Sequence, residues 1–312
     1  LGTMRDKSSG MQFIPEMPLP DGFLSSLYNS DFFAQKIVGF KPREMFRKGY
    51  SLHLPESDPE VARMLACAAD EMKLNSALLR GLKWARLFGG AIMYFSVDDG
   101  GLPGDPLNLK RLKRLNGIYV IDRRFLQSPS TIAANAMHYA DEPEYYTVSG
   151  SSERIHKSRV IRFEGSDVED RRRMELGSWG HSILQLVIEA LKRYVSSQQA
   201  GSALVSDAQQ AVFKLKGLWK AIGTNNKEAL QERMMMVDRG RSATRAILLD
   251  SEGEDFERKP TNFTGLPEVM EMFMSEISAV AEIPQTLLFG RSPAGMNATG
   301  DSDFQAFYDQ VG

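Results

Sequence analysis

The sequence contains a single cysteine, Cys67, among its 312 residues. One cysteine cannot form an intrachain disulfide, and no Cys-x-x-Cys pair is present to hold a metal ion. Without such cross-links the fold has to rest on a hydrophobic core, and a hydrophobic content of 42% in a chain of this length is sufficient for one. The sequence therefore predicts a core-stabilised protein that folds in a reducing, intracellular compartment.

Long apolar runs and an excess of either charge are also missing. No run reaches the roughly 18 apolar residues that span a bilayer, and no basic-then-apolar signal segment opens the chain. Lysine and arginine number 38 against 40 aspartates and glutamates, for a net charge of −2. A nearly neutral protein does not attract nucleic acid over its whole surface. The sequence thus predicts no membrane span and no general affinity for DNA.

Histidine is scarce, with His53, His138, His156 and His181 the four present. No two of them share a His-x-x-x-His spacing on one helix, so the three or four ligands of a metal site do not converge. His156, followed by a lysine and a serine, matches one half of the paired His-x-Ser element of two-histidine phosphodiesterases. Those enzymes need a second copy, because one histidine acts as base and the other as acid. No second copy is present in the chain.

Other catalytic motifs are incomplete. The glycines at 100–104 lack the Lys-Ser/Thr of a phosphate-binding loop. Neither Ser178 nor Ser292 lies in a Gly-x-Ser-x-Gly elbow. The three methionines at 234–236 would point around a helix rather than to one side, which favours a packing role. We therefore predict no catalytic residue, no cofactor and no metal.

Positive charge is nevertheless clustered in two stretches. One is Lys110, Arg111, Lys113, Arg114, Arg123 and Arg124, and the other lies between Arg154 and Arg173. Each cluster is either a solvated face or a surface that meets phosphate or another subunit. The candidate contacts to DNA or to a neighbouring subunit are Lys110, Arg111, Lys113, Arg114 and, in a later loop, Arg291.

Hydrophobic periodicity and turn residues predict the elements. Helices are expected within 22–40, at 43–46 after Pro42, at 59–72, 75–88, 180–216 (as one helix or two), 227–238 and 266–281, and from about 299–303 onward. Strands are expected at 91–97, 117–122, 145–149, 158–163 and 243–250, and a Gly/Pro-rich loop after Pro284. Helices, then strands, then helices predict an α+β protein rather than alternating βαβ units.

Several stretches resemble one family in the same order along the chain. They are 1–7, 31–38 with 42–49, 154–165 with 179–184, and above all 282–312, which contains Leu-Phe-Gly-Arg-Ser-Pro-Ala-Gly followed by Asn-Ala-Thr-Gly. All resemble segments of the portal proteins of tailed bacteriophages. The resemblance implies an α+β portal fold, helix-rich, with a small mixed β region and long stem-type helices.

The resemblance also implies a division of the chain. Residues 1–22 would form an N-terminal arm, 23–182 a wing-like α+β region, 183–245 the stem or clip helices, and 246–312 a strand, helix and Gly/Pro loop returning to the core. Portals of this kind continue beyond the Asn-Ala-Thr-Gly helix, so we expect the chain to be a fragment without its C-terminal crown.

The function implied is structural rather than enzymatic. A portal is a ring of about twelve identical subunits at one capsid vertex, a closed homo-oligomer. It carries double-stranded DNA non-specifically during packaging and ejection, and it docks terminase, capsid and head-tail connector proteins. Such a protein is expected in the virion after assembly in the host cytoplasm.

Two alternatives from other classes stay open. Some phage proteins of portal-like sequence are grouped with anti-CBASS proteins that degrade cyclic-nucleotide defence signals, so a cyclic-oligonucleotide phosphodiesterase is one alternative. A separate domain outside this chain could carry such an activity. The second alternative is a nucleic-acid-binding scaffold, which would bind DNA tightly as an isolated subunit.

Overall fold

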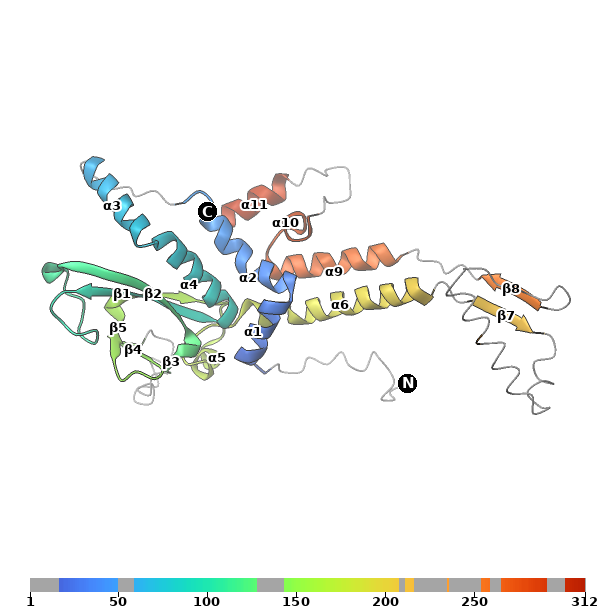
Figure 1. The fold of residues 1–312 in the computed structure, drawn as a ribbon, viewed down its shortest axis with the longest axis horizontal. Coiled ribbons are helices and arrows are strands. Elements are labelled where there is room, and N and C mark those ends of the chain that lie inside the picture. The colour runs from blue at the N-terminus through green and yellow to red at the C-terminus, as the bar shows by residue number, and fades with distance from the viewer. Residues whose placement is uncertain are drawn as a thin grey trace. The chain divides into compact units, whose positions relative to one another are not determined.

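The computed structural model describes residues 17–49, 59–127, 143–207, 211–215, 235, 254–258, 265–290 and 301–311. The chain divides into two compact units, the first made of Leu1–Leu191 with Met274–Gly312 and the second of Lys192–Phe273. Figure 1 labels the elements of both. None of the helices in the described residues is long and apolar enough to cross a membrane. Wing and stem are parts of a ring assembly, so the division at 22, 182 and 245 stays a prediction.

The first unit opens with four helices. They are α1 (Asp21–Ser30), α2 (Phe32–Met45), α3 (Pro59–Glu71) and α4 (Leu74–Phe88). Asp31 caps α2, since its carboxylate accepts the backbone N–H of Ala34 at 2.7 Å. The start of α3 at Pro59 and the end of α4 before Gly89 confirm the sequence predictions. Gly89 has a φ of 89°, a left-handed conformation that suits glycine at a helix end.

Pro42 lies inside α2, so the separate short helix predicted for 43–46 is wrong. Proline lacks an N–H and leaves the carbonyl four residues earlier without its helical partner. Here that carbonyl belongs to Val38, and the Nε of Arg86 on α4 donates to it at 3.2 Å. A second guanidinium nitrogen of Arg86 donates to the carbonyl of Ile37 at 3.0 Å. A tertiary contact thus replaces the hydrogen bond that proline removes.

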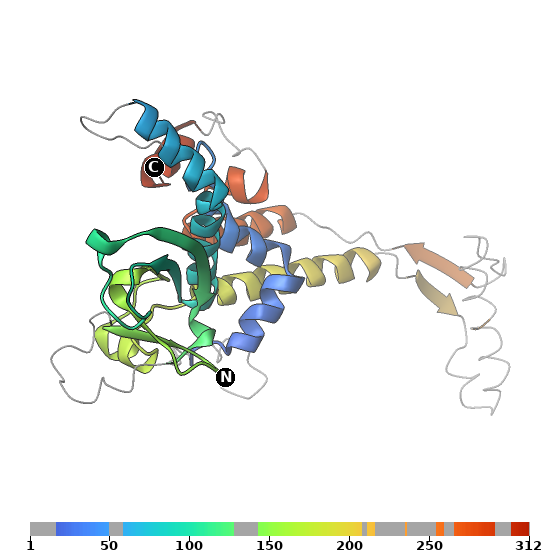
Figure 2. The ribbon, with the colours of Figure 1, turned by 60° about the vertical axis from the view of Figure 1, so that its left-hand side comes forward.

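Two small antiparallel sheets follow α4. The first has the strand order β2-β1-β6, and the second has the order β3-β4-β5. Their bounds are β1 (Gly90–Asp98), β2 (Arg114–Asp122), β3 (Leu126–Gln127), β4 (Tyr145–Val148), β5 (Arg154–His156) and β6 (Val160–Glu164). Helix α4 contacts all three strands of the first sheet on one face of that sheet. The second sheet lies on the other face of the first sheet (Figures 1 and 2). Short connecting elements are η2 (Leu109–Arg111), η3 (Arg123–Phe125), η5 (Lys157–Arg159) and α5 (Asp170–Glu175).

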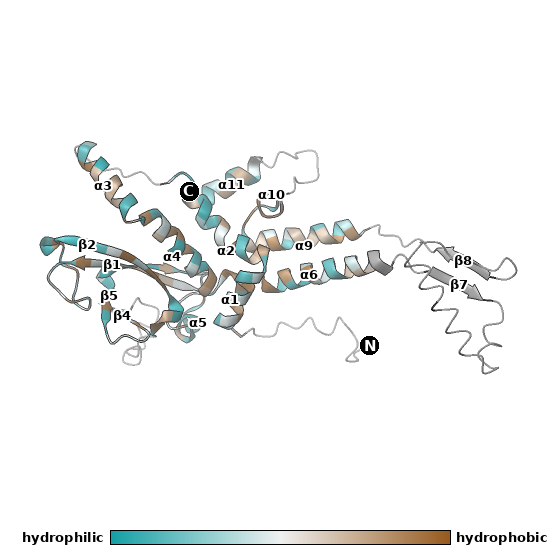
Figure 3. Ribbon diagram, in the orientation of Figure 1, coloured by the Kyte–Doolittle hydropathy of each residue, from teal (hydrophilic) through white to brown (hydrophobic). Residues whose placement is uncertain are grey.

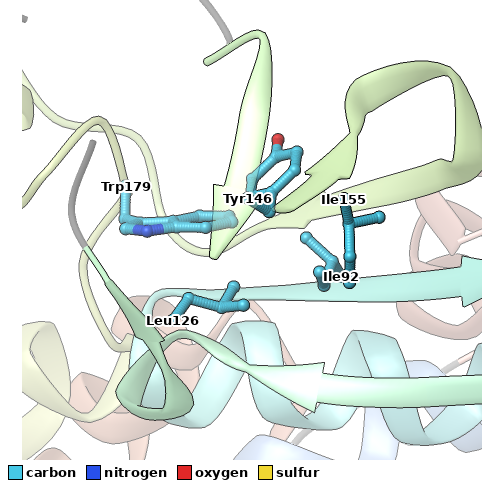
Figure 4. Packing of buried hydrophobic residues seen from close by; sticks show 5 residues of the cluster. All are labelled: Ile92, Leu126, Tyr146, Ile155 and Trp179. Atoms are coloured by element: carbon cyan, nitrogen blue, oxygen red, sulfur yellow. The ribbon is translucent and has the colours of Figure 1, made fainter. Parts of the chain in front are cut away.

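The core of this unit includes a cluster between the two sheets, shown in Figure 4. Its members are Ile92, Leu126, Tyr146, Ile155 and Trp179. Trp179 comes from the loop before α6 and lies with its ring against the backbone of Gly90. The guanidinium of Arg162 lies 4.1 Å from the Trp179 ring centroid. The cluster joins residues separated by almost ninety positions, so it depends on the whole sheet arrangement.

The C-terminal part of the first unit packs on α2. Helix α9 (Leu266–Ala281), which belongs to this unit from Met274 onward, has the bounds expected from its periodicity. Helix α11 (Asp301–Val311) begins where the cap residues predict. A short helix, α10 (Gln285–Phe289), occupies the start of the segment predicted to be a Gly/Pro-rich loop, so that part of the prediction is wrong. Contacts with α2 account for this helix. Leu288 is buried, and Lys36 of α2 donates to its carbonyl at 2.7 Å.

The second unit holds the C-terminal part of α6 (Ile183–Asp207) and a two-stranded antiparallel sheet of β7 (Ala211–Leu215) and β8 (Glu254–Arg258). The predicted helix over 180–216 is therefore too long, since 211–215 is a strand. Its partner lies about forty residues away, beyond the reach of any local pattern. The helix predicted at 227–238 and the strand at 243–250 lie outside the described residues, apart from Met235, which is helical.

A pair of matched glycine substitutions tests the sheet core. Gly90→Ala would place its Cβ inside the ring of Trp179, and we expect the free energy of unfolding to fall by about 1–3 kcal/mol. The control is Gly22→Ala in α1, where no atom lies within 4 Å of the new Cβ. This variant should raise the free energy of unfolding by up to about 1 kcal/mol, because alanine favours a helix over glycine. Urea unfolding of both variants measures the difference, and equal stability of the two would contradict the packing.

Candidate functional site

The four basic residues singled out from sequence lie together at the end of the β1–β2 hairpin. Lys110 and Arg111 are in η2, Lys113 directly follows, and Arg114 opens β2. All four side chains are exposed, and none forms an ion pair with another described residue. They belong to, or adjoin, the segment 99–113 that joins the two strands, which we call the hairpin loop. Arg291 lies outside the described residues.

A buried ion pair anchors the hairpin loop. The Nη2 of Arg159, in η5, donates to Oδ2 of Asp99 at 2.8 Å, and the two side chains are 2% and 1% exposed. The Nε of Arg159 also donates to the carbonyl of Asp105 at 2.8 Å. A charge pair removed from water is tolerated only when its remaining donors and acceptors are satisfied. Arg159 therefore holds the loop at both its first residue and its middle.

Backbone groups complete the surroundings of Asp99. The N–H of Asn108 donates to Oδ2 at 3.0 Å, and that of Gly101 donates to Oδ1 at 3.2 Å. The Asn108 bond is the main cause that holds the pKa of Asp99 at about 2; burial opposes it, and Arg159 and Gly101 add to it. Asp99 is accordingly ionised at neutral pH and closes the loop from Gly101 to Asn108.

His156 supports the same loop, which accounts for its place in a half-motif. Its Nδ1 accepts the N–H of Ser158 at 3.1 Å and lies 2.8 Å from the Ser158 hydroxyl. That hydroxyl accepts the N–H of Leu107 at 2.8 Å, and the N–H of His156 donates to Pro103 at 3.0 Å. Because Nδ1 accepts an amide proton, it carries no proton of its own, and the hydroxyl donates to it. His156 thus caps η5 and ties it to the hairpin loop.

Most other arginines of the two clusters have partners within the chain. Arg123 pairs with Asp21 at 2.8 Å, and Arg124 pairs with Asp122 at 2.9 Å while lying over the Phe88 ring. The remaining pairs are Arg162 with Glu164, Arg172 with Glu175, and Arg173 with Glu164 and Asp167. These side chains therefore act within the fold. Arg154, Lys157 and Arg171 are also exposed, but the hairpin loop groups four exposed cations in one short segment and is the candidate contact surface.

The histidines do not come together in the described residues. His181 lies beside Arg172, whose Nε is 3.3 Å from its Nε2, and burial is the main cause that lowers the pKa of His181. His53 and His138 lie outside the described residues. No group of three His, Cys, Asp or Glu side chains in the described part of the chain is placed to hold a metal ion.

Sequence reasoning missed the leucines of the hairpin loop. Leu102, Leu109 and Leu112 are 73%, 72% and 43% exposed. Leu109 and Leu112 alternate with the basic residues, so this end of the loop presents apolar and positive groups together. Four leucines in one loop, at 102, 107, 109 and 112, are the signal that would have revealed this surface, because loops are ordinarily polar.

Replacement of Asp99 tests the anchor. The folded-state pKa lies below its ordinary value, so the carboxylate stabilises the fold above about pH 4, and this contribution is lost as the pH falls toward 2. We expect Asp99→Asn to lower the Tm at pH 7 by several degrees and to weaken the fall in stability between pH 4 and pH 2. The exposed Asp98→Asn is the control. A variant with the wild-type Tm would contradict the proposed role of the pair.

The chain resembles known proteins over almost its whole length. Residues 24–312 match the family model described as phage portal protein. The chain is 31% identical to the Anti-CBASS protein Acb1 of Caulobacter sp. (strain RHG1), over 99% of this chain and 51% of that protein. It is 25% identical to an uncharacterized protein of Haemophilus influenzae (strain ATCC 51907 / DSM 11121 / KW20 / Rd), over 92% of this chain and 65% of that protein. The chain thus spans about half the length of the first of these relatives.

Solved structures agree in fold. A chain of the neck of a native GTA particle, computed with C12 symmetry, has a TM-score of 0.52 at 15% identity, over 97% of this chain and 79% of that one. A chain of the neck of an empty GTA particle, computed with C6 symmetry, has a TM-score of 0.54 at 17% identity, over 96% and 78%. With the family match extending over nearly the whole sequence, the chain belongs to the phage portal protein family and has its helix-rich α+β fold.

Proposed function

We propose that this chain is the subunit of a portal ring at a capsid vertex, through which DNA enters and leaves the particle. The observation that carries the proposal is the family match over residues 24–312. The likeness in fold to chains of GTA particle necks, one computed with C12 symmetry, supports it. A ring of about twelve copies would follow from heterologous contacts that close on themselves.

The proposal includes the partners and parts expected from the sequence. Such a ring would dock terminase, capsid proteins and head-tail connector proteins, and would act in the virion after assembly in the host cytoplasm. The arm, wing, stem and return segments would have the bounds 1–22, 23–182, 183–245 and 246–312. Each of these assignments is a prediction for the assembled particle.

The pattern of charges suits a channel that DNA moves through. Arg123, Arg124 and Arg173 are engaged in ion pairs within the chain. A protein that neutralises few phosphates binds DNA weakly, without sequence preference, and less at higher salt. A passage for moving DNA must not hold it, so weak binding is the behaviour expected of a portal.

The relative named Anti-CBASS protein Acb1 favours one alternative, a cyclic-oligonucleotide phosphodiesterase. Such chemistry requires two histidines that can exchange protons with substrate. His156 is 9% exposed, and its Nδ1 is occupied by Ser158. This geometry supports a structural role for His156, and we propose that the chain itself has no enzymatic activity.

Assembly of the full-length protein that contains this chain tests the portal proposal. We expect the purified protein to form rings of about twelve copies, because a portal subunit is self-complementary around a closed axis. Light scattering measures the mass, and negative-stain microscopy shows the rings. A full-length protein that stays monomeric at micromolar concentration would overturn the proposal.

Turnover of cyclic oligonucleotides tests the alternative. We expect no hydrolysis above background by this chain, and no difference between wild type and His156→Gln, because no second catalytic histidine faces His156 in the described residues. His181→Gln is the matched control. Chromatography of cyclic di- and trinucleotides after incubation gives the readout. Turnover that His156→Gln abolishes and His181→Gln leaves intact would replace the portal proposal with an enzymatic one.

A further inference from the structure

Helix α3 presents an apolar face that no other part of the described residues buries. Val61, Met64 and Leu65 are 46%, 66% and 44% exposed, and none of the thirteen residues of α3 is buried. Residues 61, 64, 65 and 68 recur at the spacing of one helix face. Figure 3 shows the hydrophobic and hydrophilic residues along α3. An apolar face of this kind marks a place where another protein surface binds.

The charges on α3 are mainly acidic. Asp70 and Glu71, both exposed, end the helix, Glu60 is in its first turn, and Arg63 is its one basic residue. The hairpin loop has the opposite character, because Leu102 and Leu109 stand beside Lys110, Arg111, Lys113 and Arg114. Both surfaces therefore expose apolar groups, and their charges are of opposite sign.

We propose that the hairpin loop of one subunit docks on the α3 face of the next copy around the ring. Leu109 and Leu102 would pack on Met64, Val61 and Leu65, while the basic residues would face Glu71, which flanks that apolar face. This inference rests on the proposed portal function and names the surfaces that join its subunits. It assigns Lys110, Arg111, Lys113 and Arg114 to a subunit contact rather than to DNA.

The leucines are the reason for choosing protein over DNA. An interface with DNA is polar and strongly positive, and its positive groups meet phosphates. Leucines with 72–73% exposure would stay in water or against phosphate there, without gain. Protein interfaces instead have an apolar centre with a charged rim. The hairpin loop, with Leu109 among four cations, has that arrangement.

The rigidity of the hairpin loop favours the same conclusion. Arg159, Asp99 and Ser158 fix it through the bonds described above. A surface that is ordered before binding loses less conformational entropy on association. The two surfaces differ, so the contact is heterologous: each copy gives its loop to one neighbour and its α3 to the other, and a suitable rotation closes the ring.

Single aspartate substitutions in the full-length protein test each surface. Leu109→Asp and Met64→Asp place a charge at the centre of the contact without disturbing buried residues, because both side chains are exposed. We expect each to weaken ring assembly at least about tenfold in concentration, as centrally placed interface residues do. Leu109→Met and Met64→Leu, which keep the apolar surface, are the matched controls and should assemble like wild type. Circular dichroism should show all four folded.

Mixing the two aspartate variants gives the decisive readout. The Met64→Asp protein has an intact hairpin loop, and the Leu109→Asp protein has an intact α3. The loop of the first can therefore dock on the α3 of the second. The reverse contact carries both substitutions and does not form. We expect 1:1 pairs in mass photometry, rather than rings, from the mixture and from neither variant alone. A mixture without pairs would show that these two surfaces are not partners and would overturn the inference.

The remaining outcomes separate this inference from the function on which it rests. A wild-type protein that forms no rings overturns the portal proposal and the inference with it. Wild-type rings together with unimpaired assembly of both aspartate variants overturn the inference alone. If Lys110→Glu with Arg111→Glu assembles normally but retains less DNA in the ring, the hairpin loop faces DNA and the inference is wrong.

Discussion

A buried ion pair between Arg159 and Asp99 fixes the hairpin loop, the surface that we propose joins neighbouring subunits. Asp99 follows β1, whereas Arg159 precedes β6, so the pair joins the hairpin loop to the opposite edge of the first sheet. Its isolated contribution to stability is small, because two desolvated charges gain little net energy. Its effect is positional, since it fixes where Leu109 and the basic residues stand. A long loop is thereby converted into a defined surface.

Some arginines stabilise the fold, whereas the basic residues of the hairpin loop are exposed to partners. Arg162 lies over Trp179 and donates to the carbonyl of Ser178, and Arg86 donates to the Val38 carbonyl that Pro42 leaves without a helical partner. Arginine suits these places because its planar fork can donate several hydrogen bonds while its face stacks on a ring. The hairpin loop groups four exposed cations with exposed leucines, whereas Arg86 and Arg162 act within the fold.

The relatives of this chain share its sequence pattern but carry different names. The same segment matches portal proteins and about half of a protein named for anti-CBASS activity. A shared fold does not carry a shared activity, because activity depends on particular side chains. In this chain His156 is committed to Ser158 and the hairpin loop, so a structural role accounts for it fully. The proposed portal function rests on the family match over residues 24–312 and requires no catalytic group.

By itself, the sequence determined the α+β class, the portal resemblance and the elements whose signals are local, such as α4, α9, β1 and the start of α3 at Pro59. It also identified the basic residues from Lys110 to Arg114. Only the tertiary structure decided that Pro42 lies within α2, that 211–215 pairs with 254–258, and that Arg159 is buried while Lys110 is exposed. Periodicity and capping act within a few residues. Burial and strand pairing depend on residues that approach only when the whole chain folds.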